Sequence, residues 1–461
     1  PAAAADRAHT LKVYNWADYI DMDNVLNTFP AWYKEQTGEE VTIQYSTFDI
    51  NESMLTQIEV GHEDYDVICP SEYIIERMLR NNLLLKIDKN FGQTPDYTVN
   101  VAPFAKEKFQ EMAPDSTVNV EDYTIGYMWG TTGVLYNTKY VDGADLQSWS
   151  FLTNPKFAGK VFMKDAFRDI YSCVVLYAYK DEIARGEVTR DDLVAHITPE
   201  RIHRVEDTLK VAKSNIAGWE VDFGKEEMCK GQTWMNVSWS GDAQWAIDEA
   251  ADGVELAYIV PEEGSNVWFD GWCIPKYAKN QKAASYFINY LCMPENAILN
   301  MEEIGYVSVI ASPEILEWAD DAAENEETAD LSYFFGEGAT AVHANQVLYP
   351  DRSVIERCAL MHDCGDQTAD MLEMWNRVKG DNLSSGMVIF LAVVLILIVG
   401  GIIFATVIKT KRKRSNADGG NKDRNRPPAL TVSRADEGLD VRWIGFAFHL
   451  HHISILYGIT H

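Results

Sequence analysis

Residues 268–272, Trp-Phe-Asp-Gly-Trp, place one carboxylate among two indole rings and a phenyl ring. Aromatic faces attract positive charge and a carboxylate neutralises it, so this combination suits an organic cation that is removed from water. The stretch also fits a strand with alternating buried aromatic residues and one solvated Asp. Taken alone, the stretch favours the ordinary strand over a cation site. The decision between these two interpretations depends on whether the same chemistry recurs elsewhere in the chain.

Similar combinations recur at distant turns of the chain, around residues 16–19, 71–73 and 239–242. The candidate aromatic and hydroxyl side chains are Trp16, Tyr19, Ser71, Tyr73, Trp239, Trp268 and Tyr306. The candidate carboxylates are Asp18, Asp165, Asp169, Asp242 and Asp270. Together they predict an aromatic slot with acids at its ends, which suits an elongated dication.

Two of these acids, Asp165 and Asp169, are four residues apart and would share one face of a helix. Acids near a helix N-terminus also serve as caps, so a purely structural role is equally compatible with this spacing. Buried acids are costly unless a cation completes the site. We therefore expect the empty site to be open and hydrated, and the ligand to favour closure.

Short strand-like and helix-like segments alternate along the first part of the chain. The strand candidates are residues 11–16, 41–45 and 65–69, and the helix candidates between and after them are 25–36, 51–60 and 72–79. This alternation predicts an α/β sheet with helices on both faces. In such sheets ligands bind at the carboxyl ends of strands, where the turns at 16–19 and 71–73 begin.

Two other segments carry predictions about local structure. The Gly-Thr-Thr-Gly sequence at 130–133 predicts a hinge or tight turn, because it matches no phosphate-binding loop. Residues 354–379 predict one long terminal helix.

The composition limits the class of protein. A chain of 461 residues with 47% hydrophobic content is long and apolar enough for two or three folded domains. The net charge of the whole chain is −30, and the part before residue 409 carries −35, because residues 409–461 are net basic. Such a charge repels nucleic acid and steers cations, although solubility or a salt-rich habitat would also explain it. We expect no nucleic-acid partner.

The seven cysteines show no paired spacing. This argues against a zinc site and a full disulfide framework, so we expect mostly free thiols and no metal or cofactor. No Ser-His-Asp order stands out, and the acids lie among aromatic residues that bind rather than react. The sequence therefore disfavours an enzyme.

Residues 387–408 form an uncharged run that is long enough to cross a bilayer as a helix. A basic segment follows at 409–414, and the positive-inside rule then places the acidic domain outside the cytoplasm. We expect a cytoplasmic, basic and disordered tail at 409–461. Residues 1–10 have the character of a processed or truncated N-terminus.

Six motifs occur in a fixed order: VYNWADY at 13–19, YDVICPSEY at 65–73, YMWGTTG at 127–133, WFD at 268–270, IGY at 304–306 and LYP at 348–350. In content and order they resemble the extracytoplasmic spermidine/putrescine-binding proteins of ABC importers. The resemblance covers residues 11–379 and implies a two-lobed α/β periplasmic-binding-protein fold of type II. The chain would cross between the lobes near 124–130 and 264–268. Lobe 1 would comprise 11–126 and 267–312, and lobe 2 would comprise 127–266 and 313–380.

The resemblance also implies a role for each candidate residue. Trp16 and Tyr19 would form a first aromatic pair around Asp18, and Ser71 and Tyr73 would form a second pair. Trp239 would stack on the ligand's methylene groups, and Tyr306 would be an aromatic wall of the site from late in the chain. Asp270 would anchor an amine beside the Trp268 ring, and Asp169 would be a further acid for an amine. Two features depart from the family. Ala166 stands where a second acid is expected, with Asp165 one position away, and a late Gln of spermidine-preferring members has no counterpart. Asp242 matches an acid of putrescine-preferring members, which favours a short diamine or mixed specificity.

The function implied is a membrane-anchored binding component that delivers putrescine or spermidine to an ABC permease and its ATPase. A membrane helix departs from the family, whose members are usually free in the periplasm or lipid-anchored. An amine-sensing ectodomain and a binder of another small solute with the same fold are the alternatives. A ferric-ion binder would need Tyr and His ligands and an anion binder would need Arg, and the matched positions hold neither pattern.

Overall fold

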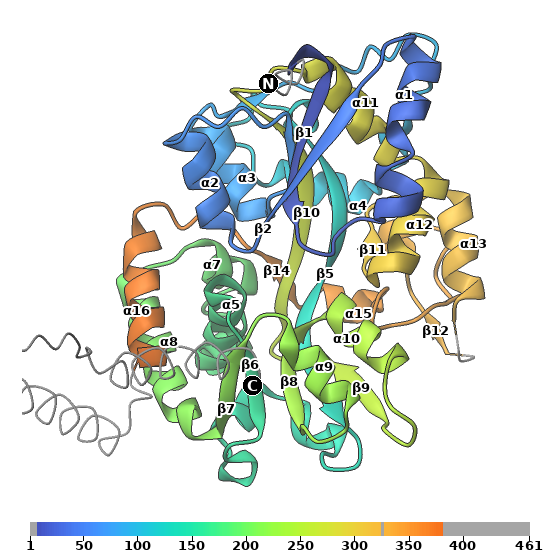
Figure 1. The fold of residues 1–461 in the computed structure, drawn as a ribbon. Coiled ribbons are helices and arrows are strands. Elements are labelled where there is room, and N and C mark those ends of the chain that lie inside the picture. Colours follow the sequence, from blue (N-terminus) through green and yellow to red (C-terminus); the bar gives the residue numbers. More distant parts are fainter. Residues whose placement is uncertain (1–6, 324–326, 381–461) are drawn as a thin grey trace, which may run out of the picture. The chain divides into compact units, whose positions relative to one another are not determined.

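Two long antiparallel strands, β5 (Thr124–Asn137) and β10 (Ser265–Pro275), run side by side through the middle of the fold (Figure 1). The computed structural model describes residues 7–323 and 327–380. A lobe of strands and helices lies at each end of this pair, as the two-lobed α/β prediction required. The expected transmembrane helix at 387–408, the tail at 409–461 and the first six residues lie outside the described residues. Between residues 7 and 380, leaving out 324–326, no helix has the length and apolar character needed to span a bilayer.

The tight turn, one of the two predictions for residues 130–133, is wrong, because this segment lies inside β5 and pairs on both sides, whereas the hinge stays a prediction. Gly130 pairs with Trp268 of β10, and Gly133 pairs with Ser238 on the other lobe's sheet. A Cβ atom on Gly130 would lie 2.7 Å from the Trp268 ring and 2.3 Å from Ser240 Oγ. The glycine is required for close packing rather than for a reversal of the chain.

The first lobe is built on a sheet in the order β2-β1-β3-β10-β5, in which β1 is parallel to both β2 and β3. Its strands are β1 (Thr10–Trp16), β2 (Thr42–Phe48), β3 (Val67–Ile68), β4 (Leu84–Leu85) and β11 (Val307–Ser308). Its helices are α1 (Phe29–Thr37), α2 (Asn51–Glu59), α3 (Glu72–Arg80), α4 (Pro103–Gln110), α11 (Gln281–Leu291) and α12 (Pro294–Ile304). The alternation predicted from sequence is therefore present in this lobe.

The second lobe continues the sheet through β5-β8-β6-β7, with β9 also paired to β5. Its strands are β6 (Val161–Lys164), β7 (Ile216–Glu220), β8 (Met235–Trp239) and β9 (Leu256–Ile259). Its helices are α5 (Phe167–Ala178), α6 (Lys180–Ala184), α7 (Arg190–Ala195), α8 (Pro199–Ala212), α9 (Phe223–Cys229) and α10 (Ser240–Asp248). Because β6 and β8 are parallel, they end at the same edge of the sheet and bring α5 and α10 together there.

The last part of the chain returns to both lobes. Its elements are α13 (Pro313–Asp321), β12 (Thr328–Ala329), α14 (Ser332–Phe335), β13 (Val342–His343), α15 (Arg352–Ile355), β14 (Cys358–Leu360) and α16 (Thr368–Gly380). Helix α13 packs on α12 and α14 packs on α4, whereas α16 packs on α8. The division into lobes at individual residues stays a prediction, and these contacts favour placing α13 and α14 with the first lobe.

The single long helix predicted at 354–379 is wrong, because the segment is divided into α15, β14 and α16. Strand β14 pairs in parallel with the start of β10, which takes its residues out of helical geometry. Gly365 then adopts a left-handed conformation with φ +52°, so the chain turns before α16 begins.

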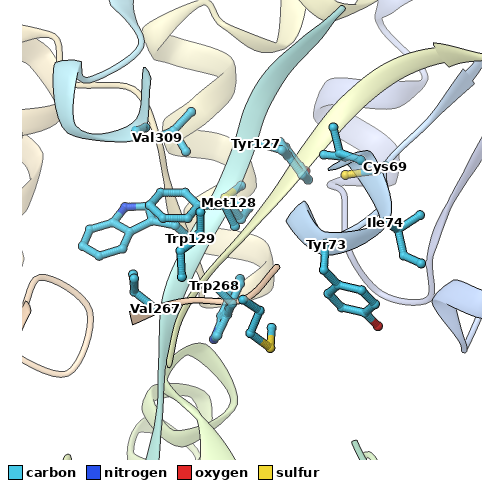
Figure 2. Packing of buried hydrophobic residues seen from close by; sticks show 14 of the residues in the cluster. Cys69, Tyr73, Ile74, Tyr127, Met128, Trp129, Val267, Trp268 and Val309 are labelled. Atoms are coloured by element: carbon cyan, nitrogen blue, oxygen red, sulfur yellow. The ribbon is translucent and has the colours of Figure 1, made fainter. Parts of the chain in front are cut away.

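The core around the two long strands is rich in aromatic residues. Phe269 and Trp272 are buried, and Phe269 stacks on Trp129 of β5 with ring centroids 5.9 Å apart. Figure 2 shows Trp129 and Trp268 on the two neighbouring long strands, with Tyr127 and Met128 further along β5. All seven cysteines are free thiols, as predicted.

Candidate ligand-binding site

Asp270 lies at an irregularity of β10, where the register with β5 shifts between Phe269 and Gly271. Irregular positions of this kind re-aim side chains, and here Asp270 leaves the β5 ladder and forms an isolated bridge with Ser71. Its Oδ1 accepts a 2.7 Å hydrogen bond from Ser71 Oγ and its Oδ2 accepts one of 2.7 Å from Tyr19 OH. Two segments that begin at the carboxyl ends of β1 and β3 therefore supply the donors.

Asp270 is an acid that is buried and has a raised pKa. The residue is 6% exposed, and burial raises its pKa to about 6 against the lowering effect of the Ser71 and Tyr19 hydrogen bonds. The charge of Asp169 adds to the increase. Within the part of the chain that the structure describes, no Lys, Arg or His forms an ion pair with it. Asp270 is therefore a buried carboxylate that is solvated only by neutral donors.

An aromatic cluster of Tyr19, Trp268 and Tyr306 links the two lobes. Tyr306 meets Tyr19 and Trp268 edge to face, with centroid separations of 5.5 Å in both pairs. The cluster depends on a close backbone approach, because a Cβ atom on Gly241 would lie 2.4 Å from the Tyr306 ring. Tyr306 OH donates a 2.8 Å hydrogen bond to Asp242 Oδ1, so the aromatic cluster connects Asp270 at one end to Asp242 at the other.

Asp242, near the start of α10, is paired with two lysines of its own lobe. Lys164 Nζ lies 3.4 Å from Oδ2 and Lys225 Nζ lies 3.1 Å from Oδ1. Burial would raise the pKa of Asp242, but the charges of Lys164 and Lys225 outweigh it and hold that pKa below its usual value. This acid is charged and already neutralised by the chain.

Asp169 lies in the first turn of α5 and is buried among neutral donors. Its Oδ1 accepts hydrogen bonds of 2.9 Å from Asn266 Nδ2, 3.2 Å from Trp239 Nε1 and 3.4 Å from Thr132 Oγ1. Burial raises the pKa of Asp169, although these hydrogen bonds and the neighbouring Arg168 act in the opposite direction. Asp169 thus resembles Asp270 more than Asp242.

Tyr73 contacts the second lobe through Arg168. The Arg168 guanidinium lies 5.3 Å from the centre of the Tyr73 ring, a cation–π distance, and it also donates a hydrogen bond to the His362 carbonyl. Tyr73 OH donates to Glu52 Oε1 at 3.3 Å and accepts from Asn51 Nδ2 at 3.1 Å. Asn51 also donates to Ser71 Oγ at 3.0 Å, so one amide orients both members of the second predicted pair.

Comparison with known proteins assigns the chain to a family. Residues 31–327 match the bacterial extracellular solute-binding proteins. The chain belongs to this family. It is a solute-binding protein of the kind that serves transporters and not an enzyme.

Named relatives of this solute-binding protein are polyamine-binding proteins. The spermidine/putrescine-binding periplasmic protein of Escherichia coli is 26% identical over 82% of this chain and 94% of its own length. The putrescine-binding periplasmic protein PotF of E. coli is 28% identical over 62% of this chain and 74% of its own length. The crystal structure of the spermidine/putrescine substrate-binding protein PotD from Streptococcus pneumoniae covers 80% of this chain and 98% of its own, with 27% identity and a TM-score of 0.57.

The solute-binding protein brings most of the predicted residues together. Tyr19, Ser71 and Asp270 share hydrogen bonds, Trp268 and Tyr306 share ring contacts, and Trp239 bonds to Asp169. Trp16 packs beside Phe48 at 4.5 Å, and Asp18 is exposed in a left-handed conformation with φ +50°. Asp18 contributes to the raised pKa of Lys225 after the larger effects of burial, which lowers it, and of Asp242 and Asp222, which raise it. Asp18 therefore lies at the solvent-facing side of the same charge cluster.

Asp165 does not join the other acids, so its predicted place in the site is wrong. Its Oδ1 accepts a 2.9 Å hydrogen bond from Trp375 Nε1 and its Oδ2 pairs with Lys379, both on α16. The prediction assumed that Asp165 and Asp169 share a helix face, but α5 begins at Phe167. Asp165 precedes the helix and is turned toward the terminal helix instead.

The expected open and hydrated arrangement also differs from the structure. Asp169, Asp242 and Asp270 are between 4% and 8% exposed. The contact between Tyr306 OH and Asp242 and that between Arg168 and Tyr73 bring the lobes together over the site. The structure therefore presents the site in a closed arrangement.

Sequence reasoning missed four polar side chains of the site: Lys164, Lys225, Arg168 and Asn51. Lys164 ends β6 and is buried, and Arg168 adjoins Asp169 at the start of α5. A lysine at the carboxyl end of an apolar strand was the available signal, because that edge is where ligands bind. No cluster of His, Cys, Asp and Glu in residues 7–323 and 327–380 is arranged to hold a metal ion.

Proposed function

We propose that this solute-binding protein captures a polyamine of the putrescine or spermidine type between its two lobes and delivers it to an ABC importer. The observation that carries the proposal is Asp270, a buried carboxylate with a pKa raised to about 6, whose side-chain hydrogen bonds within the described residues come from the neutral hydroxyls of Ser71 and Tyr19. A buried ionised acid is costly unless a cation completes its surroundings. A primary ammonium group supplies that charge and three hydrogen-bond donors.

The surroundings of Asp270 support an amine with an apolar chain. The rings of Tyr19, Trp268 and Tyr306 provide faces for methylene groups, and Asp169 provides a second buried carboxylate with only neutral hydrogen-bond donors. The polyamine-binding relatives agree with this chemistry. The predicted site residues are proposed as the lining of the binding site, with Asp165 left out.

We further propose that the binding domain is extracytoplasmic and is held at the membrane by a helix at 387–408, with the tail at 409–461 in the cytoplasm. This part rests on the sequence pattern alone. An anchor would raise the effective concentration of the receptor beside its permease and ATPase partners.

The direct test is isothermal titration calorimetry of the full chain with putrescine, spermidine, succinate and ferric citrate. The proposal predicts saturable binding of at least one polyamine and no binding of succinate, because Asp270 would repel a dicarboxylate and no Lys, Arg or His of the described residues forms an ion pair with it. Absence of binding with both polyamines at high micromolar concentration would refute the proposal. Binding of ferric citrate alone would assign the protein to another class of solute.

A further inference from the structure

Lys164 lies where a cationic ligand would be expected to bind. Its ammonium nitrogen is 4.6 Å from the centre of the Trp239 ring and 3.4 Å from Asp242 Oδ2. An aromatic face and a carboxylate are the two groups that recognise an organic ammonium ion. At this end of the site the chain itself therefore supplies the cation.

The position of Lys164 is fixed by buried partners. Its Nζ also contacts Glu220 Oε1 at 2.9 Å and donates to the Val221 carbonyl at 2.6 Å. The side chains of Lys164 and Glu220 are 1% and 0% exposed. The three contacts to Glu220, Val221 and Asp242 use all the donors of the ammonium group.

Glu220 is itself held in place, which prevents the lysine from moving easily. Its Oε2 accepts a 3.0 Å hydrogen bond from the Gly224 amide and its Oε1 accepts one of 2.8 Å from Asn236 Nδ2. A Cβ atom on Gly224 would lie 2.5 Å from the Glu220 carboxyl carbon, so α9 approaches the acid as closely as a glycine allows. The Lys164–Glu220 pair is a built part of the second lobe.

Lys225 occupies the other oxygen of Asp242. Its Nζ lies 3.1 Å from Oδ1, which also accepts the Tyr306 hydroxyl, and 5.2 Å from the centre of the Trp245 ring. Both oxygens of Asp242 are therefore used, and two positive charges lie around them. A ligand ammonium group arriving here would have to displace Lys164 or Lys225 from Asp242, because both oxygens are in use and the buried acid Glu220 is also paired with Lys164.

We propose that Lys164 and Lys225 are specificity-determining residues that fill the Asp242 end of the site with ammonium groups of the chain. The inference rests on the proposed polyamine function and deepens it. The ligand is then restricted to the part of the site around Asp270 and Asp169, where the carboxylates accept hydrogen bonds from neutral donors. A short diamine meets this restriction, and a triamine whose third ammonium group extends toward Asp242 is rejected.

The test compares putrescine with spermidine by calorimetry on the full chain, in the wild type and in Lys225→Met and Lys164→Met. The wild type is expected to bind putrescine more tightly than spermidine. Removing either ammonium group is expected to raise the ratio of spermidine to putrescine affinity at least tenfold, because Asp242 becomes available to the third amine. Lys230→Met is the matched control, since Lys230 is exposed, follows α9 and pairs with Glu227, and its ratio is expected to stay that of the wild type.

Lys225→Met keeps the test decisive if Lys164→Met fails to fold, because the Lys225 side chain is 25% exposed and Lys164 remains on Asp242. A ratio within twofold of the wild type in a folded Lys225→Met protein would overturn the inference and leave the polyamine function standing. A wild type that prefers spermidine would overturn it as well. A wild type that binds neither polyamine would refute the proposed function itself, and this inference with it.

Discussion

Asp270 and Asp242 are two buried carboxylates at opposite ends of one aromatic cluster, and they differ in what neutralises them. Both are about equally buried, at 6% and 4% exposure, and each accepts a hydrogen bond from a tyrosine hydroxyl. Asp242 is also paired with Lys164 and Lys225, whereas the partners of Asp270 are neutral hydroxyls. Burial alone therefore does not mark an acid as a ligand anchor, because the source of the compensating charge decides its role.

The opposite directions of the two pKa shifts express this difference. The lysine charges outweigh burial at Asp242 and lower its pKa, whereas burial dominates at Asp270 and raises its pKa to about 6. Asp242 is stabilised by the folded chain. The folded chain destabilises the charged form of Asp270. An external cation that pairs with this carboxylate therefore gains more binding free energy than it would at an acid that is already neutralised.

The largest expected effect is on stability at the Asp242 end. Asp242→Asn removes the carboxylate between two lysines, and breaking a buried pair of this kind is expected to lower the free energy of unfolding by about 3 kcal/mol. Chemical denaturation without ligand measures the change. Asp270→Asn is the comparison variant and should not lose stability at pH 8, because it removes a buried charge that lacks a cation. Equal destabilisation of both variants would contradict the difference between the two ends.

The next effect is on affinity at the Asp270 end. Asp270→Asn is expected to weaken putrescine binding by about 2 kcal/mol, roughly 30-fold, because a charge-assisted hydrogen bond to the amine is lost. Calorimetry at pH 8 measures this change. Asp165→Asn is the control, since Asp165 bonds to Trp375 and Lys379 outside the cluster. An affinity of Asp270→Asn equal to that of the wild type would remove Asp270 from the binding site.

A smaller effect is expected where the two ends are joined. Gly241→Ala places a methyl group 2.4 Å from the Tyr306 ring, and the resulting strain is expected to cost about 1–2 kcal/mol of stability. Displacement of the ring would also lengthen the Tyr306–Asp242 hydrogen bond. Thermal unfolding compares this variant with Gly338→Ala, whose added methyl group meets no atom within 4 Å. Unchanged stability of Gly241→Ala would show that the ring tolerates displacement and that the cluster is not tightly packed.

The sequence predicted best those features that depend on local pattern. Alternation of apolar segments located β1, which ends at Trp16, and the turn that leads to Tyr19, and motif content pointed to Ser71, Asp270 and Tyr306. Each of these residues lies in or next to a strand or turn that the local sequence predicts, so its position depends largely on its neighbours in the chain.

The features that failed depend on contacts between distant segments. The helix start at Phe167 decides that Asp165 turns toward α16, and strand β14 exists because it pairs with β10. Lys164 neutralises Asp242 only because β6 and β8 end at the same edge of the sheet. Hydrophobic periodicity does not report which buried charges will meet, and so the distinction between the two ends of the site required the structure.

The sign of the pH dependence at Asp270 follows from its raised pKa. The ionised form binds the amine, so lowering the pH through 6 protonates the carboxyl and weakens putrescine binding, by about tenfold at pH 5 relative to pH 8. In the ligand-free protein the same protonation removes the cost of a buried charge, so this group favours folding more as the pH falls through 6. Asp242, with a lowered pKa, should contribute neither effect in this range.

The most direct test measures the protons exchanged when putrescine binds at pH 6, by calorimetry in buffers of different ionisation enthalpy. Asp270 with a pKa of about 6 is half protonated at this pH, and the ligand amines remain charged because their pKa is about 10. Binding is then expected to release about half a proton per ligand in the wild type, and this release is expected to disappear in Asp270→Asn. Binding without proton release in the wild type would show that the ligand cation does not pair with Asp270, and would contradict the account of the site.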